Sequence, residues 1–182
     1  MTDRAALIVE DDADVLRAAR IVLADSFHPV ASATDPGQLE DLLQQRSFDV
    51  VLLDMNFVHG ERSGREGLDA LDRIRHADPD LAVVLMTAYG GVTLAVQALK
   101  RGAEDFVLKP WHNEKLLGSV LAAAAATRTR RDADRLNLDL LERQTIERAL
   151  AQHRGNISLA AAALGLSRPA LYRRLAKYGL QG

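Results

Sequence analysis

Cysteine is absent from this chain of 182 residues. Its absence excludes disulfide bonds, thiolate metal sites and cysteine nucleophiles, and it permits a reducing compartment. The sequence also lacks a signal peptide and any run of about 18 apolar residues, so no membrane-spanning segment is predicted. Because 48% of the residues are hydrophobic, a buried core is expected. These features favour a soluble, cytoplasmic protein with no membrane partner.

Charge is distributed unevenly along the sequence. Residues 1–120 hold 12 Lys and Arg against 20 Asp and Glu, a net charge of -8, whereas residues 121–182 hold 11 against 5, a net charge of +6. A basic tail on an acidic module often binds nucleic acid, although solvated charge on ordinary helices produces the same count. The asymmetry therefore predicts two modules with different partners.

Five short apolar runs in the first 110 residues alternate with stretches of helical spacing. The runs cover residues 5–9, 29–33, 48–53, 81–86 and 105–108. Helical spacing is found in residues 13–24 and 65–75. One Asp-Pro pair at 35–36 predicts a helix start, and another at 78–79 predicts a helix end. This alternation predicts an α/β fold in which helices cover both faces of a parallel sheet.

Acidic residues directly follow two of these runs. Glu10, Asp11 and Asp12 come after the first run, and Asp54 comes after the third. The carboxyl ends of parallel strands meet at one edge of a sheet, where function gathers. Two carboxylates about 4 Å apart repel by about 4 kcal/mol at an effective dielectric constant of about 20, so this cluster favours a cation, and oxygen ligands favour Mg2+. The triplet alone is equally consistent with a solvated helix start.

A hydroxyl and an ammonium group are expected at the same edge, because Thr87 and Lys109 follow the fourth and fifth runs. With the motifs VEDD, LLDMN, MTA and LKPW in this order, residues 1–121 resemble the receiver domain of two-component response regulators. The resemblance implies a flavodoxin-like, doubly wound sheet of five parallel strands in the order 2-1-3-4-5. It also implies that Asp54 accepts a phosphoryl group from a histidine kinase.

The same resemblance implies a role for each polar group of the pocket. Asp11, Asp12 and Asp54, with the backbone carbonyl of Asn56, are expected to hold Mg2+. The cation neutralises charge that develops on the phosphoryl oxygens. Thr87 is expected to hydrogen-bond the attached group. The remaining polar residue, Lys109, is expected to pair with it, next to a cis peptide bond before Pro110.

Thr87 and Phe106 are expected to form the switch that responds to phosphorylation. Phe106 lacks the hydroxyl of a tyrosine, so its movement has to act sterically; a plain core phenylalanine is the alternative interpretation. The expected output is a changed surface on the fourth helix, fifth strand and fifth helix, which the family uses for homodimerisation.

The segment that follows the phosphoacceptor departs from the receiver pattern. Residues 57–64 form a longer loop than usual and lack its proline. His59, Glu61 or Arg62 are candidates to tune dephosphorylation or the choice of partner. A solvated loop without a chemical role is the favoured interpretation.

Strand signals cease near residue 112. Five alanines at 122–126 predict helix, whereas the charged stretch 127–135 fits either a linker or a solvated extension of that helix. Residues 122–137 are therefore expected to be a linker or a helical extension. Three helices are predicted after it, at 138–153, 158–164 and 168–178, with a tight turn at Gly165 and Ser167 as the cap of the last helix.

The segment 138–182 resembles the factor-for-inversion-stimulation (Fis) type of helix-turn-helix, the DNA-binding end of sigma-54-dependent nitrogen-regulator-class activators. The motifs are ERAL at 147–150, GN at 155–156, LGLSR at 164–168 and LYRRL at 171–175. The start of a recognition helix reads base edges, and basic residues further along contact phosphate. Residues expected near bases are Ser167, Arg168, Ala170 and Tyr172; residues expected near the DNA backbone are Arg173, Arg174 and Lys177. A bundle whose positive charge only confers solubility is the alternative.

The resembled activators carry an ATPase between these two modules, but the chain contains no Gly-x-x-x-x-Gly-Lys-Ser/Thr motif. Together these features predict a DNA-binding response regulator, not an enzyme, that dimerises and controls transcription from duplex DNA after Asp54 is phosphorylated. Two alternatives are a receiver-type adaptor whose tail binds protein and a magnesium-dependent phosphohydrolase. The second usually needs an acid where this chain has Asn56.

Overall fold

The structure is a computed structural model that describes residues 4–57, 64–88 and 92–180. The chain divides into two compact units, Met1–Arg131 and Asp132–Gly182. Within the described ranges, no helix combines the length and the apolar character needed to cross a bilayer.

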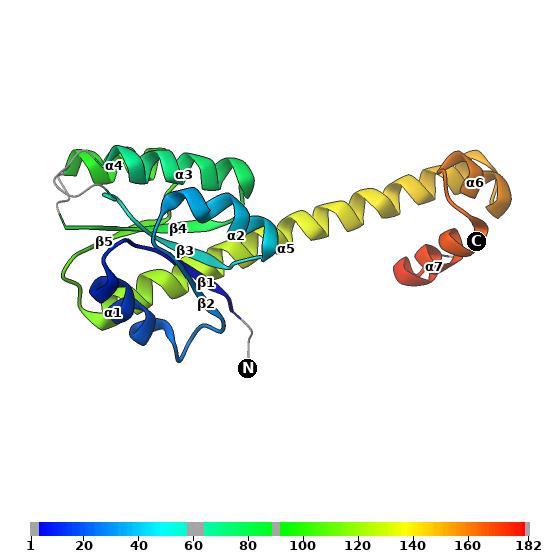
Figure 1. The fold of residues 1–182 in the computed structure, drawn as a ribbon. Coiled ribbons are helices and arrows are strands. Elements are labelled where there is room, and N and C mark those ends of the chain that lie inside the picture. The colour runs from blue at the N-terminus through cyan, green and yellow to red at the C-terminus, as the bar shows by residue number, and fades with distance from the viewer. Residues whose placement is uncertain (1–3, 58–63, 89–91, 181–182) are drawn as a thin grey trace. The chain divides into compact units, whose positions relative to one another are not determined.

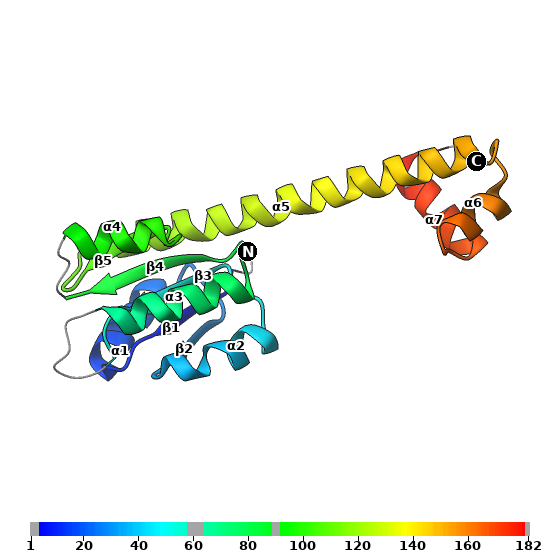
Figure 2. The same cartoon turned by 90° about the horizontal axis from the view of Figure 1, so that it is seen from above.

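The first unit is a sheet covered by helices on both faces (Figure 1). Its parallel strands are β1 (Ala6–Val9), β2 (Val30–Ala33), β3 (Val50–Asp54), β4 (Ala82–Thr87) and β5 (Asp105–Leu108). Figure 2 shows them in the order β2-β1-β3-β4-β5. The predicted α/β class, the five strands and their order are confirmed.

Alternation of side chains along each strand divides the core into two clusters. Leu7, Val9, Val51 and Leu53 face one side of the sheet, where the helices α2, α3 and α4 pack, whereas the residues between them face the other side, against α1 and α5. The helical elements of this unit are α1 (Ala13–Leu23), the 3-10 turn η1 (Pro36–Gln38), α2 (Leu39–Gln45), α3 (Arg65–Ala77), α4 (Val92–Lys100) and the first part of α5 (Asn113–Gln152). Burial on both faces explains why the strands are continuously apolar.

Short-range chemistry fixes where these helices begin and how closely they approach the sheet. Asp12 caps α1 by accepting hydrogen bonds from the backbone N–H groups of Asp14 and Val15, and Asp35 caps η1. At the start of α3, a Cβ on Gly67 would lie 2.5 Å from the Cα of Met55. Only glycine therefore allows α3 to pack against the end of β3.

The helix α5 is continuous from Asn113 to Gln152. Residues 122–137, for which the sequence allows either a linker or a helical extension, are therefore helical, and the helix predicted to begin at 138 is the later part of α5. The two compact units divide between Arg131 and Asp132. The domain limits at 121 and 138 remain predictions.

The second unit consists of the end of α5 with α6 (Ile157–Ala163) and α7 (Arg168–Tyr178). Its core combines Ile146 and Ala149 of α5, Ala160 and Ala161 of α6, and Leu171 and Leu175 of α7. Small side chains on α6 let the helices pack closely. Gly165, with φ of 66°, makes the turn between α6 and α7 in the left-handed region that favours glycine. The predicted three-helix arrangement is confirmed.

Candidate functional site

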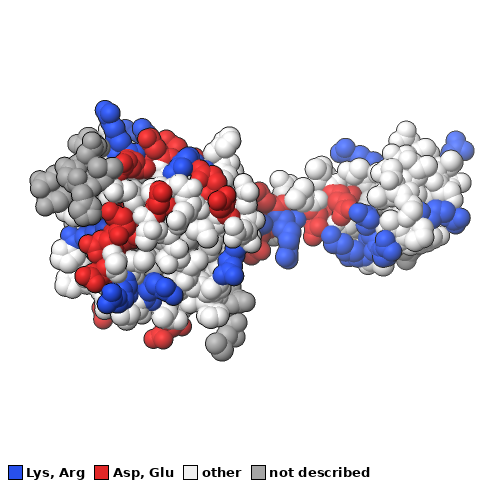
Figure 3. All heavy atoms as spheres, viewed as in Figure 1, with Lys and Arg blue, Asp and Glu red and all other residues white. Residues whose placement is uncertain are grey.

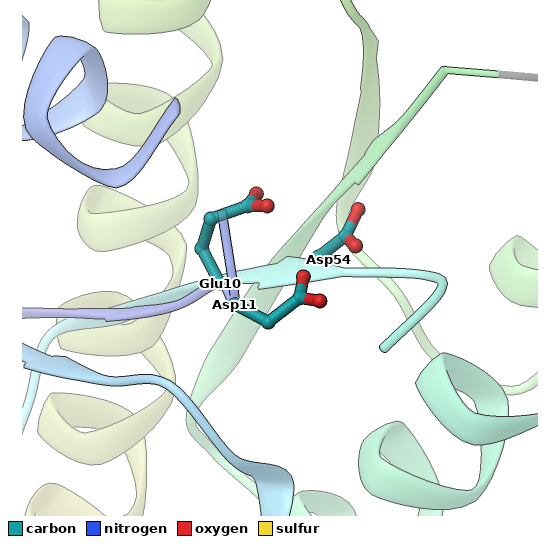
Figure 4. A group of neighbouring side chains, drawn as sticks. All are labelled: Glu10, Asp11 and Asp54. Carbon is teal, nitrogen blue, oxygen red and sulfur yellow. The ribbon is translucent and has the colours of Figure 1, made fainter. Parts of the chain in front are cut away.

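An acidic cluster lies at the carboxyl ends of β1 and β3, as the sequence predicts. Because Val9 pairs with Leu53, the residues that follow these positions are neighbours. Each of Glu10, Asp11 and Asp54 brings a carboxylate oxygen within 4.8 Å of the other two. Figure 4 shows the three carboxylates converging on one space. Glu10 and Asp54 are buried, whereas Asp11 is partly exposed.

Lys109 closes this cluster from the end of β5. Its Nζ lies 2.6 Å from Glu10 Oε2 and 2.8 Å from Asp54 Oδ1. The side chain of Lys109 is 15% exposed, compared with 1% for Glu10 and 6% for Asp54. One ammonium group is therefore shared by two buried carboxylates. The peptide bond between Lys109 and Pro110 is cis, as the resemblance implies.

Burial and the charges of neighbouring side chains shift the pKa values of Glu10 and Lys109. Burial raises the pKa of Glu10 to about 7, against the opposing effect of its hydrogen bond with Lys109, and the negative charge of Asp54 adds to the rise. Burial acts to lower the pKa of Lys109, but hydrogen bonds to Asp54 and Glu10 outweigh it and raise that pKa. Near neutral pH the lysine is therefore charged, while Glu10 is present in both its protonated and its ionised form.

The donor set fits a hard divalent cation. Three carboxylates supply oxygen ligands at one point. Burial and the negative charge of Asp54 raise the pKa of Glu10, and a bound cation would oppose that rise. Glu10, Asp11 and Asp54 would hold the ion. Glu10 is absent from the ligand set expected from the sequence, and its place directly after β1 is the signal that points to it.

The expected ligand Asp12 also has a structural role at the start of α1. Its Oδ1 accepts hydrogen bonds from Asp14 N at 2.9 Å and Val15 N at 3.1 Å, so it serves as the helix cap, and it lies outside the three-carboxylate cluster. The side chain of Asn56 accepts a hydrogen bond from Gly64 N at 3.0 Å, while its backbone N–H donates to Asp54 Oδ2 at 3.2 Å. Asp12 and the Asn56 carbonyl as metal ligands remain predictions.

The two switch candidates lie on neighbouring strands. Thr87 is 4% exposed at the end of β4, and its backbone carbonyl accepts the N–H of Lys109 at 2.8 Å. Phe106 is partly buried beside Met55, Leu85 and Leu94, around an apolar cavity of about 10 Å3 that Thr87 also lines. The loop candidates His59, Glu61 and Arg62 lie outside the described residues.

The predicted DNA-reading residues occupy the beginning and the outer surface of α7. Ser167 caps the helix through a hydrogen bond from Ala170 N, and Ala170 is half-buried. Arg168, Tyr172 and Arg173 are exposed. Lys and Arg predominate among the charged side chains that Figure 3 shows over the helix-turn-helix.

Two of the residues predicted to meet the DNA backbone, Arg174 and Lys177, already have partners on α5. Arg174 Nε donates to Glu142 Oε1 at 2.6 Å, and Lys177 Nζ lies 2.7 Å from Asp139 Oδ1. The Tyr178 hydroxyl donates to Glu142. These hydrogen bonds lower the pKa of Glu142 and Asp139, so both acids are ionised. These ion pairs join α7 to α5. The pattern of basic residues in the sequence of α7 does not reveal them.

Comparison with known proteins identifies both units. Residues 6–121 match the family described as response regulator receiver domain, and residues 137–178 match bacterial regulatory protein, Fis family. The chain therefore belongs to the response regulators, with a receiver domain joined to a Fis-type helix-turn-helix. Fifteen residues separate the two matches, too few for the ATPase of the activator class.

Similar proteins include transcriptional regulators of the same class. The chain is 38% identical over 130 residues to the alginate biosynthesis transcriptional regulatory protein AlgB of Pseudomonas aeruginosa, covering 71% of this chain and 27% of that protein. It is 32% identical over 131 residues to the nitrogen assimilation regulatory protein NtrX of Azorhizobium caulinodans, covering 71% and 28%. The chain thus spans about a quarter of the length of these relatives.

Solved receiver domains share the fold. The N-terminal signal receiver domain of a response regulator from Bacteroides fragilis is 42% identical, with a TM-score of 0.61, and the match covers 68% of this chain and 98% of that one. The receiver domain of NtrX from Brucella abortus is 32% identical, with a TM-score of 0.58 and the same coverage.

Proposed function

We propose that this chain is a phosphorylation-controlled, DNA-binding response regulator. Asp54 accepts a phosphoryl group from a histidine kinase, and the Fis-type unit binds duplex DNA in response. The observation that carries the proposal is the pairing of Lys109 with Asp54 at 2.8 Å inside a buried acidic cluster. The two family matches support the same function.

The chemistry at Asp54 is an in-line phosphoryl transfer. A carboxylate oxygen of Asp54 forms the new bond to phosphorus while the bond to the histidine nitrogen of the donor breaks, and the leaving imidazole takes up a proton. In this proposal Lys109 pairs with the attached group, and the Thr87 hydroxyl hydrogen-bonds it. Bound Mg2+ would supply positive charge that offsets the charge on the phosphoryl oxygens.

The protein's own contribution is to arrange these charges in advance. The buried lysine and the acidic cluster are fixed by strand ends, so little reorganisation is needed when the phosphoryl group arrives. Loss of that group by hydrolysis is expected to be slow, because Asn56 cannot act as the general acid of a phosphohydrolase. The hydrolase alternative and the adaptor alternative are not favoured by the family matches.

The DNA-binding form is proposed to be a homodimer. Four leucines of α5 within the second unit are largely exposed: Leu136 at 69%, Leu138 at 66%, Leu140 at 54% and Leu141 at 59%. Ile146 and Ala149 of the same helix face the helix-turn-helix core instead. A second copy that packs against this part of α5 would cover the side that carries Leu136 and Leu140, which lie one turn apart, and would present two recognition helices to a two-fold symmetric site. Solution mass measured with and without beryllofluoride, a phosphoryl mimic, tests this step.

Phosphoryl uptake is tested by incubating the chain with acetyl phosphate and Mg2+. Intact mass should show the addition of one phosphoryl group, mapped to Asp54, and the Asp54→Ala variant should show none. Uptake by Asp54→Ala equal to that of the original chain would refute the assignment. Steady turnover of a generic phosphate ester would favour the phosphohydrolase instead.

A further inference from the structure

One buried polar residue is not used by the phosphoacceptor pocket. Among the described residues, four polar or charged residues are buried: Glu10, Asp54, Thr87 and Thr127. The first three lie in or beside the pocket. Thr127 is 0% exposed on α5, six residues beyond the end of the receiver match at 121. A buried polar side chain is nearly always hydrogen-bonded, so the partner of Thr127 shows what this residue does in the fold.

Thr127 completes the hydrogen bonding at the start of β4. Its Oγ1 accepts the backbone N–H of Ala82, the first residue of β4, at 2.8 Å, and donates to the carbonyl of Ala123 at 3.3 Å. A buried N–H without an acceptor is strongly unfavourable, so the hydroxyl oxygen holds the amino end of β4 against α5.

The next residue on the helix reaches two more strands. Arg128 Nε donates to Asp49 Oδ1 at 2.8 Å, and Asp49 Oδ2 accepts the N–H of Ala5 at 2.8 Å. Asp49 immediately precedes β3, and Ala5 immediately precedes β1. Arg128 is thereby linked to the amino ends of both strands through one carboxylate.

Two further arginines reach the edge of the sheet that carries β4 and β5. Arg130 donates to the carbonyl of Asp80 at 2.9 Å and forms an ion pair with Glu104, which precedes β5. Arg131 pairs with Asp78 at 2.5 Å, at the end of α3. Each ion pair is partly exposed and weak alone, but all of them fall within one turn of α5.

We propose that Thr127, Arg128, Arg130 and Arg131 form a strand-start clamp that extends the receiver to Arg131 and couples its sheet to the output helix. Four strands are held at their amino ends by α5. At their carboxyl ends, β3 and β4 end in Asp54 and Thr87, and Lys109 follows β5. A shift of β4 or β5 on phosphorylation is then passed to the helix that enters the DNA-binding unit. The coupling part rests on the proposed function.

The position of the clamp is tested by amide hydrogen exchange in the full chain. Thr127→Val keeps the shape of the side chain but removes the acceptor, and Thr127→Ser keeps the acceptor. The Ala82 amide should exchange at least tenfold faster in Thr127→Val, and Thr127→Ser should retain most of its protection. Unchanged protection in Thr127→Val would overturn the clamp.

The coupling is tested with the double variant Arg130→Gln and Arg131→Gln. Arg135→Gln is the matched control, because it removes positive charge from the same helix outside the clamp. The affinity of each chain for a duplex that the original chain selects from a random-sequence pool is measured with and without beryllofluoride and Mg2+. Fluorine NMR reports binding of the mimic at Asp54. The double variant should bind the mimic but lose at least half of the fold-increase in duplex affinity that the original chain shows, while Arg135→Gln keeps it.

An undiminished increase in the double variant would overturn the coupling, and so would loss of mimic binding, because the variant would then act on the pocket itself. If the original chain binds the mimic but shows no increase, the coupling falls together with phosphorylation control. The exchange of the Ala82 amide then still decides whether the clamp extends the receiver.

Discussion

The two units each place one lysine between two carboxylates, with opposite degrees of burial. In the receiver, Lys109 lies 2.6 Å from Glu10 and 2.8 Å from Asp54, and the three side chains are 15%, 1% and 6% exposed. In the helix-turn-helix, Lys177 lies 2.7 Å from Asp139 and 3.7 Å from Glu142, and the exposed fractions are 51%, 40% and 37%. The chemical groups are the same, but the surroundings differ.

Burial decides what each arrangement can do. Removing one partner from a buried ion pair costs about 3–5 kcal/mol, whereas an exposed pair contributes about 0–1 kcal/mol. A cation or a phosphoryl group that enters the receiver pocket therefore changes the free energy of its buried charges strongly. The pairs on α7 only bias the orientation of a helix, and water or DNA can replace them at little cost.

The largest expected effect is on Lys109. Lys109→Gln leaves two buried carboxylates without their cation, so the free energy of unfolding of the receiver should fall by about 3 kcal/mol without Mg2+. Urea denaturation measures this change. Lys177→Gln is the matched variant, and it should lower the free energy of unfolding far less than Lys109→Gln does. Equal losses in the two variants would contradict the comparison.

The pH dependence of Glu10 sharpens the same contrast. Its pKa is raised from 4.5 to about 7 on folding, so its contribution to stability is fully present below pH 4.5 and is lost as the pH rises through about 7. The loss corresponds to about 3 kcal/mol at 1.36 kcal/mol per pKa unit.

Glu10→Gln removes this titration. Without Mg2+, the original chain should lose stability relative to Glu10→Gln as the pH rises from 4.5 to 7, because only the original chain has this titrating carboxyl. The difference in free energy of unfolding between the variant and the original chain should therefore increase over that range. Magnesium should oppose the loss in the original chain, because it binds the ionised carboxylate. A difference that stays constant over this range would show that Glu10 is not held in the environment described.

Arg173 and Arg174 are neighbours on α7 with different surroundings. Arg173 is exposed, whereas Arg174 pairs with Glu142. In duplex binding measured against salt concentration, Arg173→Gln should reduce the slope of log affinity by about 0.9 for each phosphate that is no longer neutralised. Arg174→Gln should change the slope less and lower the melting temperature more. The reverse pattern would show that Arg174 leaves Glu142 to bind phosphate.

The smallest effect is expected for Asp139. Asp139→Asn removes one carboxylate from an exposed pair, so the free energy of unfolding of the full chain should change only slightly. Thermal unfolding at low and high salt provides the measurement, and any loss should diminish at high salt. A loss as large as that of Lys109→Gln would mean that the pair is shielded from solvent.

The sequence predicted the features that depend on nearby residues. Apolar runs located the five strands, and Ser167 marked the start of α7 as its cap. Asp54 and Lys109 were placed together because strand ends share one edge. That Glu10 joins Asp11 and Asp54 in the cluster depends on the exact residue at which β1 ends, which an apolar run does not define.

Features that depend on packing between distant segments were not predicted. No pattern in residues 127–131 indicates that Thr127 lies under Ala82, because the two are 45 positions apart. In the same way, the basic pattern of α7 does not show that Glu142 faces Arg174. In both cases the partner is set by how one helix lies against another element, and only the folded structure provides that information.

The central claim is that charging the buried pocket at Asp54 controls how the helix-turn-helix binds DNA. The most direct measurement is the affinity of the full chain for a duplex selected by this chain from a random-sequence pool, with and without beryllofluoride and Mg2+, compared with Asp54→Ala. The account predicts at least tenfold tighter binding by the original chain with the mimic and no change in Asp54→Ala. Equal affinity in all four conditions, with the mimic shown to occupy Asp54 of the original chain, would contradict it.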